Sequence, residues 1–487
     1  MIRRRRLLSG TTLIALAIAG TLAPARGTPV VPRAAAGTPG LEVAAPPLRW
    51  PALDTLQAAA ATEVTYGTVA HRAGGIPVAG KVKRSPRAVA HYTGFDGWEP
   101  TLGLTSNGHI FAPFSVDVCC GLNEVLRSRD GGDTWEMASP KLPNGDNTHL
   151  VSADPYIYVD PKTDRVFTID LTLACSMLSF SDDGGDTWTT NPLACGQPIN
   201  DHQTLFSGPP IDSAPAGYPQ VLYYCFNHLA LLSSFCSKSL DGGLTFVPTG
   251  TPAHGRVDPS STDSSIPFVC GGTTGHGVVG PDGAVYLPRV DCDQPWLAIS
   301  RDEGRTWERI QVADNGGQGH EAGVAVDDKD NIYMTWTSDQ ENLPYLSVSR
   351  DQGETWSEPL MVGAPGLAQG VLPGIAVGGP GQIALVYMGT DSPDATYWNG
   401  YVTTTTDALS PEPIFHTARI GTAQDPLTFA SCLHRCESLG DFFDVVVAPD
   451  GKVWAALVDG CLACDGRNND EQGVMVEVRG RSFRPRS

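Results

Sequence analysis

Basic residues are scarce in this sequence. Its 487 residues include 33 Lys and Arg but 53 Asp and Glu, which gives a formal net charge of −20. Nucleic acids and anionic membrane surfaces require positive charge, so this balance argues against both as partners. Long hydrophobic runs are also lacking, because the apolar stretch at residues 12–22 is too short to cross a bilayer. Neutral glycans or calcium ions remain compatible with such a chain.

The first 27 residues have the features of an export signal. Arginines occupy positions 3–6, the apolar stretch follows, and Ala23-Pro24-Ala25 resembles a cleavage site. Residues 28–62 are rich in Ala, Pro and Gly without a sustained period, which predicts a flexible leader. Residues 63–487 then form one large domain of a secreted, extracellular protein, which we expect to be a monomer. Loss of the five arginines at positions 3–6 and 26 takes the net charge from −20 to about −25.

Twelve cysteines in an exported chain predict up to six disulfides. Three pairs flank single connections or sheet edges: Cys175 with Cys195, Cys225 with Cys236, and Cys270 with Cys292. The other six come from the two ends of the domain, where we expect bridges across a closing seam: Cys119, Cys120, Cys432, Cys436, Cys461 and Cys464. The spacing of the last four also allows a zinc site as an alternative.

One eight-residue pattern, Ser-x-Asp-x-Gly-x-Thr-Trp, occurs five times, with Phe246 replacing Trp in the third copy. Its aspartates are spaced 53, 58, 61 and 49 residues apart, which is about the length of one four-stranded propeller blade. Ser and Asp side chains hydrogen-bond turn backbone, Gly supplies a positive φ, and Trp buries between sheets. We therefore interpret the five aspartates as structural rather than catalytic: Asp130, Asp183, Asp241, Asp302 and Asp351.

Each copy follows an apolar strand, a turn and a second apolar strand, and two further units of this kind lack the pattern. The fold class is therefore all-β, a single β-propeller of four-stranded blades, with seven blades favoured and six as the alternative. The repeated turns lie between the third and fourth strands. The last unit ends after its third strand, so we expect the strand-like residues 63–69 to complete its sheet and close the ring.

The innermost strand of each propeller blade begins near the central axis, so residues that open these strands converge. Here almost every opening carries an acid or a histidine, which predicts a catalytic group of Glu99, Asp154, Asp201, His202, His320, Glu321 and Asp441. Substrate-binding candidates are His276, Arg289, Tyr397, Trp398 and Asp444. The structural alternative is that these are solvated strand ends and, for Tyr397 and Trp398, aromatics that anchor a loop.

Two kinds of chemistry fit this group. A pair of carboxylates can act as acid and base or nucleophile in glycosidic cleavage, with like-charge crowding raising one pKa. Alternatively, His202 or His320 can transfer a proton while nearby acids hold calcium or orient the sugar. No cofactor is required for the first; calcium is compatible with the second, and the metal ligands are not assigned.

The repeats, known as Asp boxes, on an exported propeller resemble the sialidase superfamily over roughly residues 98–478. That family includes glycosidases, polysaccharide lyases and noncatalytic glycan-binding propellers, and its boxes lie on the face opposite the active site. The family's three-arginine clamp has no recognisable match here, since Trp98-Glu99-Pro100 stands where an Arg-Ile-Pro segment is expected and none of Arg256, Arg289 and Arg435 lies in a family motif.

The resemblance favours a secreted, sialidase-like glycoside hydrolase acting on extracellular glycans. Two alternatives stay open. One is a noncatalytic propeller that binds glycan or protein, and the other is a polysaccharide lyase that uses a central histidine.

Overall fold

The computed structural model describes residues 58–484, apart from 80–84, 116–122, 142–151, 153, 173–174, 192–199, 229–230, 232, 256–271, 319, 433–435, 437–438, 461–471 and 481. The chain divides into two compact units, Met1–Leu53 and Asp54–Ser487, and every described residue belongs to the second. Regular structure in this part is β-strand, with one short 3-10 turn at Ala73–Gly75. Among these residues, no helix has the length and apolar character needed to cross a membrane.

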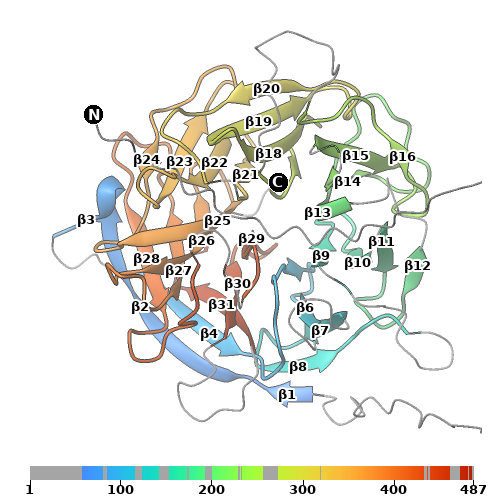
Figure 1. Ribbon diagram of the computed structural model, residues 1–487. Helices are drawn as coiled ribbons and strands as arrows, with labels where there is room; N and C mark the ends of the chain where they lie inside the picture. Colours follow the sequence, from blue (N-terminus) through green and yellow to red (C-terminus); the bar gives the residue numbers. More distant parts are fainter. Residues whose placement is uncertain are drawn as a thin grey trace, which may run out of the picture. The chain divides into compact units, whose positions relative to one another are not determined.

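The strands form antiparallel sheets that follow one another around a common axis, which is consistent with a β-propeller (Figure 1). Most sheets contain four strands, as the repeat length predicts. The first sheet has the order β1 (Ala58–Ala60), β8 (Thr134–Met137), β7 (Asn123–Ser128), β6 (Ile110–Ser115) and β5 (Gly103–Leu104). The second has β12 (Thr189–Asn191), β11 (Cys175–Ser181), β10 (Val166–Thr172) and β9 (Pro155–Val159).

The next three sheets each keep their strands in chain order. They comprise β13 (Asn200–Gly208), β14 (Val221–His228), β15 (Ser233–Ser239) and β16 (Val247–Pro248); β17 (Val278–Val279), β18 (Val285–Asp291), β19 (Gln294–Ser300) and β20 (Glu308–Gln311); and β21 (Gly323–Val326), β22 (Ile332–Thr337), β23 (Pro344–Ser349) and β24 (Leu360–Met361).

A ten-stranded sheet completes the arrangement. Its order is β25 (Gln369–Val377), β26 (Ile383–Thr390), β27 (Asn399–Thr405), β28 (Phe415–Ile420), β2 (Thr62–Arg72), β4 (Arg87–Tyr92), β31 (Gln472–Arg479), β30 (Val453–Asp459) and β29 (Asp444–Val447), with β3 (Ile76–Pro77) paired to β2. It consists of two groups of four strands joined by β2.

The N-terminal strands close the structure differently from the sequence prediction. The strand that completes the last group is β4, which pairs with β31, and not residues 63–69. Those residues belong to β2, which lies outside β4 over Thr62–Gly67 and then outside β28 over Thr68–His71. β1 starts at Ala58 and pairs with β8 of the first sheet. The last residues of the segment predicted to be a leader, 28–62, therefore belong to the sheet structure. Residues 58–77 thus follow the outer edges of successive sheets.

The core lies between neighbouring sheets. Every residue of β14, β18, β22 and β30 is buried, because the second strand of each sheet is covered on both faces. One cluster, with Phe167, Leu178 and Phe226, joins the second and third sheets, and another, with Phe206, Tyr223 and Leu287, joins the third and fourth. Truncating such a buried aromatic side chain to Ala costs about 3–5 kcal/mol.

The five repeats make the same hydrogen bonds. In residues 128–135 the Ser128 hydroxyl donates to Asp130 and accepts from the Gly132 amide, while the Thr134 amide and hydroxyl donate to the two oxygens of Asp130 at 2.9 and 2.6 Å. The equivalent bonds occur in the other four. Trp135 is fully buried and donates to the Gly132 carbonyl.

Strand register places these turns away from the strand openings. In the second sheet, Val159 pairs with Val166, which pairs with Ser181, so the repeat at 181–188 starts at the end where β9 finishes. Asp154 precedes the other end of β9.

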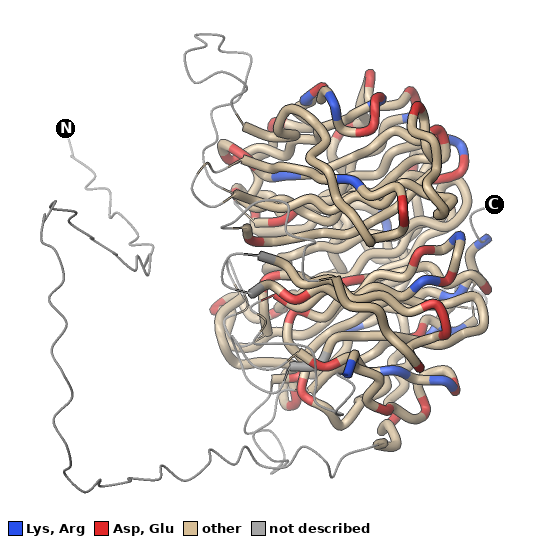
Figure 2. Tube along the Cα trace, turned by 90° about the vertical axis from the view of Figure 1, so that its right-hand side faces the viewer, with Lys and Arg blue, Asp and Glu red and all other residues tan. Residues whose placement is uncertain are grey.

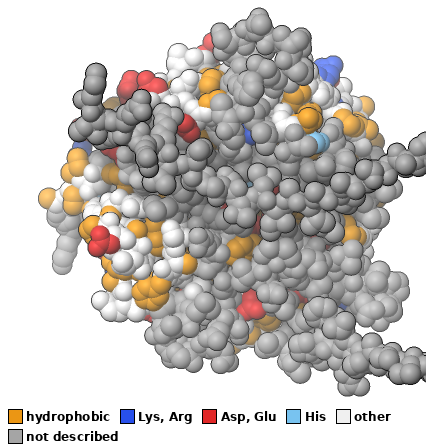
Figure 3. All heavy atoms as spheres, in the orientation of Figure 1, with side chains coloured by type: hydrophobic (Ala, Val, Ile, Leu, Met, Phe, Trp, Pro, Cys, Tyr) orange, Lys and Arg blue, Asp and Glu red, His pale blue; other side chains and the backbone are white. Residues whose placement is uncertain are grey.

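Figure 2 shows Lys and Arg, mixed with acids, concentrated toward one end of the sheets. On the face toward the viewer in Figure 3, few Lys and Arg are seen among the described side chains.

Two disulfides lie wholly within the described residues. Cys225–Cys236 joins directly paired positions of β14 and β15, in agreement with the sequence prediction. Cys432 bonds to Cys436, so these two neither bridge the seam nor ligate zinc, and that expectation was wrong. Cys292 is also disulfide-bonded, whereas Cys119, Cys120, Cys195, Cys270, Cys461 and Cys464 lie outside the described residues. The side chain of Cys175 also lies outside the described part of the protein.

The turn hydrogen bonds should contribute measurably to stability. We expect Asp183→Ala to lower the free energy of unfolding by about 1–3 kcal/mol, because the carboxylate accepts several bonds. Burial opposes ionisation, but the bonds from Thr187 and Ser181 outweigh it and hold the pKa of Asp183 at about 2. A depressed pKa stabilises the fold above the unfolded value, so this contribution should disappear as the pH falls from about 4 through about 2.

Urea denaturation of the variant at pH 7 and pH 3 tests this, with Glu354→Ala as control. Glu354 is an exposed side chain of the fifth repeat, and its loss should change stability by less than about 0.5 kcal/mol. Equal stability of Asp183→Ala and the wild-type protein at pH 7 would contradict the structural role.

Candidate functional site

The predicted strand openings lie where innermost strands begin. Asp154 directly precedes β9, Asp201 and His202 are the second and third residues of β13, and Glu321 lies two residues before β21. Glu99 precedes β5, Asp441 precedes β29, and Asp444 is the first residue of β29. Five of these residues are linked by hydrogen bonds or ion pairs that cross sheets, and Asp201 interacts electrostatically with Asp154. We call them the axial cluster: Glu99, Asp154, Asp201, His202, Glu321 and Asp441.

His202 is the centre of the axial cluster. Its Nδ1 lies 2.5 Å from Oε1 of Glu321, and its Nε2 lies 3.5 Å from Oδ2 of Asp441. Its backbone amide donates to Oδ2 of Asp154 at 3.2 Å. The side chain is buried, and its imidazole joins Glu321 and Asp441, while the His202 amide adds Asp154 of a third sheet.

The backbone of β13 is distorted where it presents this imidazole. His202 has φ 48°, a left-handed conformation, and the register with β14 shifts between Asp201 and Thr204. A bulge of this kind redirects a side chain, and a positive φ at a residue other than Gly costs about 1–3 kcal/mol. The Gln203 side chain donates to the Asp154 carbonyl at 2.5 Å, which fixes the distorted segment against β9.

Glu99 holds the last sheet against the first. It is buried, its φ is 44°, and its Oε1 accepts a hydrogen bond from the Asp441 amide at 3.1 Å. Its own amide donates to the Leu439 carbonyl at 3.3 Å. Gly440 packs so closely on Glu99 that an added Cβ would lie 2.2 Å from its Cγ. Glu99 therefore positions Asp441 from a distance of 342 residues in sequence.

Electrostatics set the protonation of the axial cluster. Burial lowers the pKa of His202, but the charge of Glu321 and hydrogen bonds to Asp441 and Glu321 outweigh burial and raise the pKa well above its usual value. The surroundings of His202 therefore favour the protonated imidazole. Burial, and next the charge of Asp201, raise the pKa of Asp154 to about 7. One carboxyl group that retains its proton near neutrality thus lies beside others and a fixed cation.

A cavity of about 380 Å³ extends from the cluster along the axis. Seven innermost strands of the described chain line it, β5, β9, β13, β17, β21, β25 and β29, mostly with Val, Ile, Leu and Ala side chains. Glu321 belongs to both the lining and the axial cluster. The cavity therefore joins a charged end to an apolar shaft.

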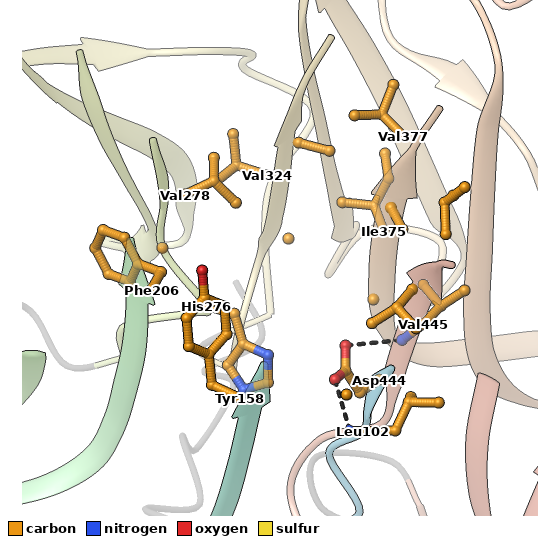
Figure 4. Close-up of a pocket in the computed structure, with 18 of the residues that line it drawn as sticks. Leu102, Tyr158, Phe206, His276, Val278, Val324, Ile375, Val377, Asp444 and Val445 are labelled. Carbon is orange, nitrogen blue, oxygen red and sulfur yellow. Dashed lines mark hydrogen bonds between the residues drawn. The ribbon is translucent and has the colours of Figure 1, made fainter. Parts of the chain in front are cut away.

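His276 and Asp444 lie on facing sides of this cavity (Figure 4). Asp444 accepts hydrogen bonds from the amides of Leu102 at 3.0 Å and Val445 at 2.8 Å, and burial raises its pKa. The His276 ring makes edge contacts with Tyr156 and Phe442, each at 5.1 Å between centroids. Phe442 also contacts His202, so it links the two histidines.

His320 and Arg289 make hydrogen bonds outside the contacts described for the axial cluster. The His320 amide donates to the Gln318 carbonyl at 2.7 Å. Arg289 is buried and donates to Asn227, Ser234 and the Gly272 carbonyl, while burial lowers its pKa. Its guanidinium is thus committed to neighbouring strands.

The two loop aromatics also face elsewhere. Tyr397 donates to Asp391 at 2.7 Å, and Trp398 is fully buried in the core beside β27. A fully buried indole has no face to offer a sugar, which matches the alternative of a loop anchored by aromatics.

Sequence reasoning missed Tyr156, Gln203 and Phe442. Each lies within two residues of a predicted acid or histidine, and Phe442 follows Asp441 directly. Their signal was the strand opening itself, but aromatic and amide residues there are also typical of ordinary packing.

No protein-family model matches the chain, and no curated protein sequence matches it. Solved structures that are similar include a Hadza microbial sialidase, with 18% identity, 66% of this chain and 66% of that chain covered, and a TM-score of 0.40. An alpha-L-arabinanase from Penicillium chrysogenum has 15% identity, 73% and 98% coverage, and a TM-score of 0.39. A polysaccharide lyase, an ulvan lyase, has 11% identity, 68% and 94% coverage, and a TM-score of 0.40. Likeness at this level assigns neither reaction nor substrate to the chain.

Proposed function

We propose that the chain is an exported, seven-bladed β-propeller whose axial cluster hydrolyses glycosidic bonds in neutral glycans. The observation that carries this proposal is the contact of His202 with Glu321, Asp441 and Asp154, residues from separate sheets, of which Glu321 also lines the cavity. Seven innermost strands around the cavity support the blade number, with one strand for each blade. The disulfides support an oxidising, extracellular location.

Asp154 is the general acid in this proposal. A carboxyl group with a pKa of about 7 keeps its proton near neutral pH and can donate it to the leaving glycosidic oxygen. Asp201, whose charge contributes to that raised pKa, is the partner carboxylate that activates water or attacks the sugar carbon. Water supplies the hydroxyl group of the product, and its proton returns the carboxyl groups to their starting state.

His202 acts as a positioning cation. Its raised pKa means that the ring already carries a proton at neutral pH, so it is unsuited to abstract one from a uronic acid carbon. This favours hydrolysis over the lyase alternative. The imidazolium instead balances Glu321 and Asp441 and holds the bulged segment that carries Asp201.

The charge of the axial cluster favours a neutral substrate. Five of its six side chains are carboxyl groups, and His202 is the basic side chain that the described contacts place among them. A sialic or uronic acid carboxylate would meet like charge at the opening. Tyr156, His276 and Phe442 line the cavity, where a neutral sugar ring can pack against the half-buried His276.

Carboxylate oxygens of the axial cluster are the ligands that calcium prefers. However, the His202 cation lies among them and already supplies positive charge there. The proposed hydrolysis therefore assigns calcium no step.

The reaction can be tested with the secreted protein, residues 28–487, on a panel of neutral glycosides, neutral polysaccharides, sialosides and uronic acid polymers. We expect reducing ends from neutral substrates, with kcat/KM falling as the pH rises above about 7, because Asp154 then loses the proton it donates. Asp154→Asn should lower kcat/KM by about 10²–10⁴-fold.

Glu354→Gln, in the fifth repeat at the other end of the sheets, is the control and should retain wild-type activity. Saturable glycan binding without turnover would replace the proposal by a binding propeller. Release of unsaturated uronate would replace it by a lyase.

The protonation of His202 has its own test. In Glu321→Gln the main charge that favours imidazolium is removed, so the pKa of His202 should fall, by roughly one to three pH units. Imidazole NMR titration of the two proteins measures this directly. A titration midpoint for His202 at or below 6.5 in the wild-type protein would contradict the role of a fixed cation.

A further inference from the structure

A second group of ionisable side chains shares no residue with the axial cluster. Glu63 of β2, His91 of β4 and Asp133 of the first repeat each offer one ligand atom, and these atoms all lie within 4.8 Å of one another. Nδ1 of His91 is 3.6 Å from Oε1 of Glu63. The group unites the N-terminal segment, the last sheet and the first sheet.

Strand pairing fixes all three positions. Glu63 and His91 are direct partners in the β2–β4 ladder, so their side chains lie on the same face. The Ala61 amide donates to the Asp133 carbonyl at 2.9 Å, and Ala60 pairs with Thr134. One short segment, residues 58–63, therefore both carries Glu63 and holds the turn that carries Asp133.

His91 is unusual for its position. It is fully buried, it packs against the Trp454 ring, and neither ring nitrogen has a hydrogen-bond partner. Buried polar groups are nearly always paired, so an unpaired imidazole beside two carboxylates indicates a ligand. Its ring lies directly beneath Gly132, where an added Cβ would be 3.1 Å from Nδ1.

The other repeats show what ordinary packing looks like at this place. Beneath three of the four matching glycines lie hydrophobic side chains: Phe111 under Gly185, Leu178 and Phe167 under Gly243, and Ile299 under Gly353; Thr249 lies under the fourth, Gly304. Packing alone therefore does not require a histidine there. Only the first repeat, among the five, combines the buried imidazole with converging carboxylates.

The neighbouring arginine, Arg479, occupies one of the two carboxylate oxygens of Glu63. Arg479 donates to Glu63 Oε1 at 3.1 Å and also pairs with Glu477, which leaves Oε2 of Glu63 for another partner. Glu63 and Asp133 are exposed, so their side chains can adjust toward a common point.

We propose that Glu63, His91 and Asp133 bind a divalent first-row transition metal, with Zn²⁺ as the best fit, and that this metal ties the N-terminal segment across the seam between the last and first sheets. One imidazole and two carboxylates suit zinc, whereas calcium takes six or more oxygen ligands. Tetrahedral zinc places its ligand atoms ~3.3 Å apart, so the exposed carboxylates close inward by about an ångström. Water fills the fourth position.

Titration calorimetry and thermal melting of chelator-treated protein with ZnCl₂ test this site. We expect one equivalent of zinc to bind and the melting temperature to rise by roughly 2 °C or more at saturation. His91→Phe, which copies the packing of the other repeats, should remove that equivalent and the zinc-dependent rise while the protein stays folded. Asp133→Asn and Glu63→Gln should each weaken binding at least tenfold.

Glu354→Gln is the matched control, since Glu354 occupies the position of Asp133 in the fifth repeat, above Ile299. It should bind zinc as the wild-type protein does. Zinc bound elsewhere on the chain is common to all these proteins and cancels in the comparison. Absence of the equivalent from wild-type protein, or its full retention in His91→Phe, would overturn the site. These outcomes do not depend on whether the axial cluster hydrolyses glycans.

Discussion

The pairing of β4 with β31 is the contact on which the arrangement of the axial cluster depends. It brings strands about 385 residues apart in sequence into one sheet and places that last sheet beside the first. The Glu99 to Asp441 hydrogen bond exists only because of this closure, since its two residues belong to those two sheets. The site is therefore a product of ring closure, and local sequence around each acid does not by itself create it.

The contacts made by ring closure also offset two unfavourable features of the axial cluster, its strained backbone and its buried charges. Glu99 and His202 both have positive φ, at a cost of about 1–3 kcal/mol each. Burying several carboxyl groups is also unfavourable, unless paired charge compensates. The His202 cation provides that compensation for Glu321 and Asp441, and Asp154 reduces the remaining repulsion by keeping its proton. The two residues with distorted backbone are the ones that join different sheets.

Much of this organisation could be predicted from the sequence, because the spacing of the repeats and the alternation of apolar strands with turns are local signals. The repeats predicted the sheets, and the strand openings predicted the residues that meet at the axis. Outer edges could not be predicted in the same way, since β2 changes partner from β4 to β28 within one strand and no local pattern records that switch. Arg289 and Trp398 show the same limit, because their buried positions depend on contacts between distant segments. The Cys432–Cys436 bond was missed because distant pairing across the seam was expected.

The position of Arg289 also bears on substrate charge. An arginine aimed into the cavity would have balanced the carboxyl groups and accepted an acidic sugar, but its donors are occupied by Asn227, Ser234 and the Gly272 carbonyl. The axial cluster consequently relies on one imidazolium, which is already held between Glu321 and Asp441. A cation so committed cannot also pair strongly with a substrate carboxylate, because any approach to that anion weakens the two contacts that keep it charged. The proposed preference for uncharged sugars thus rests on the same charge balance among His202, Glu321 and Asp441.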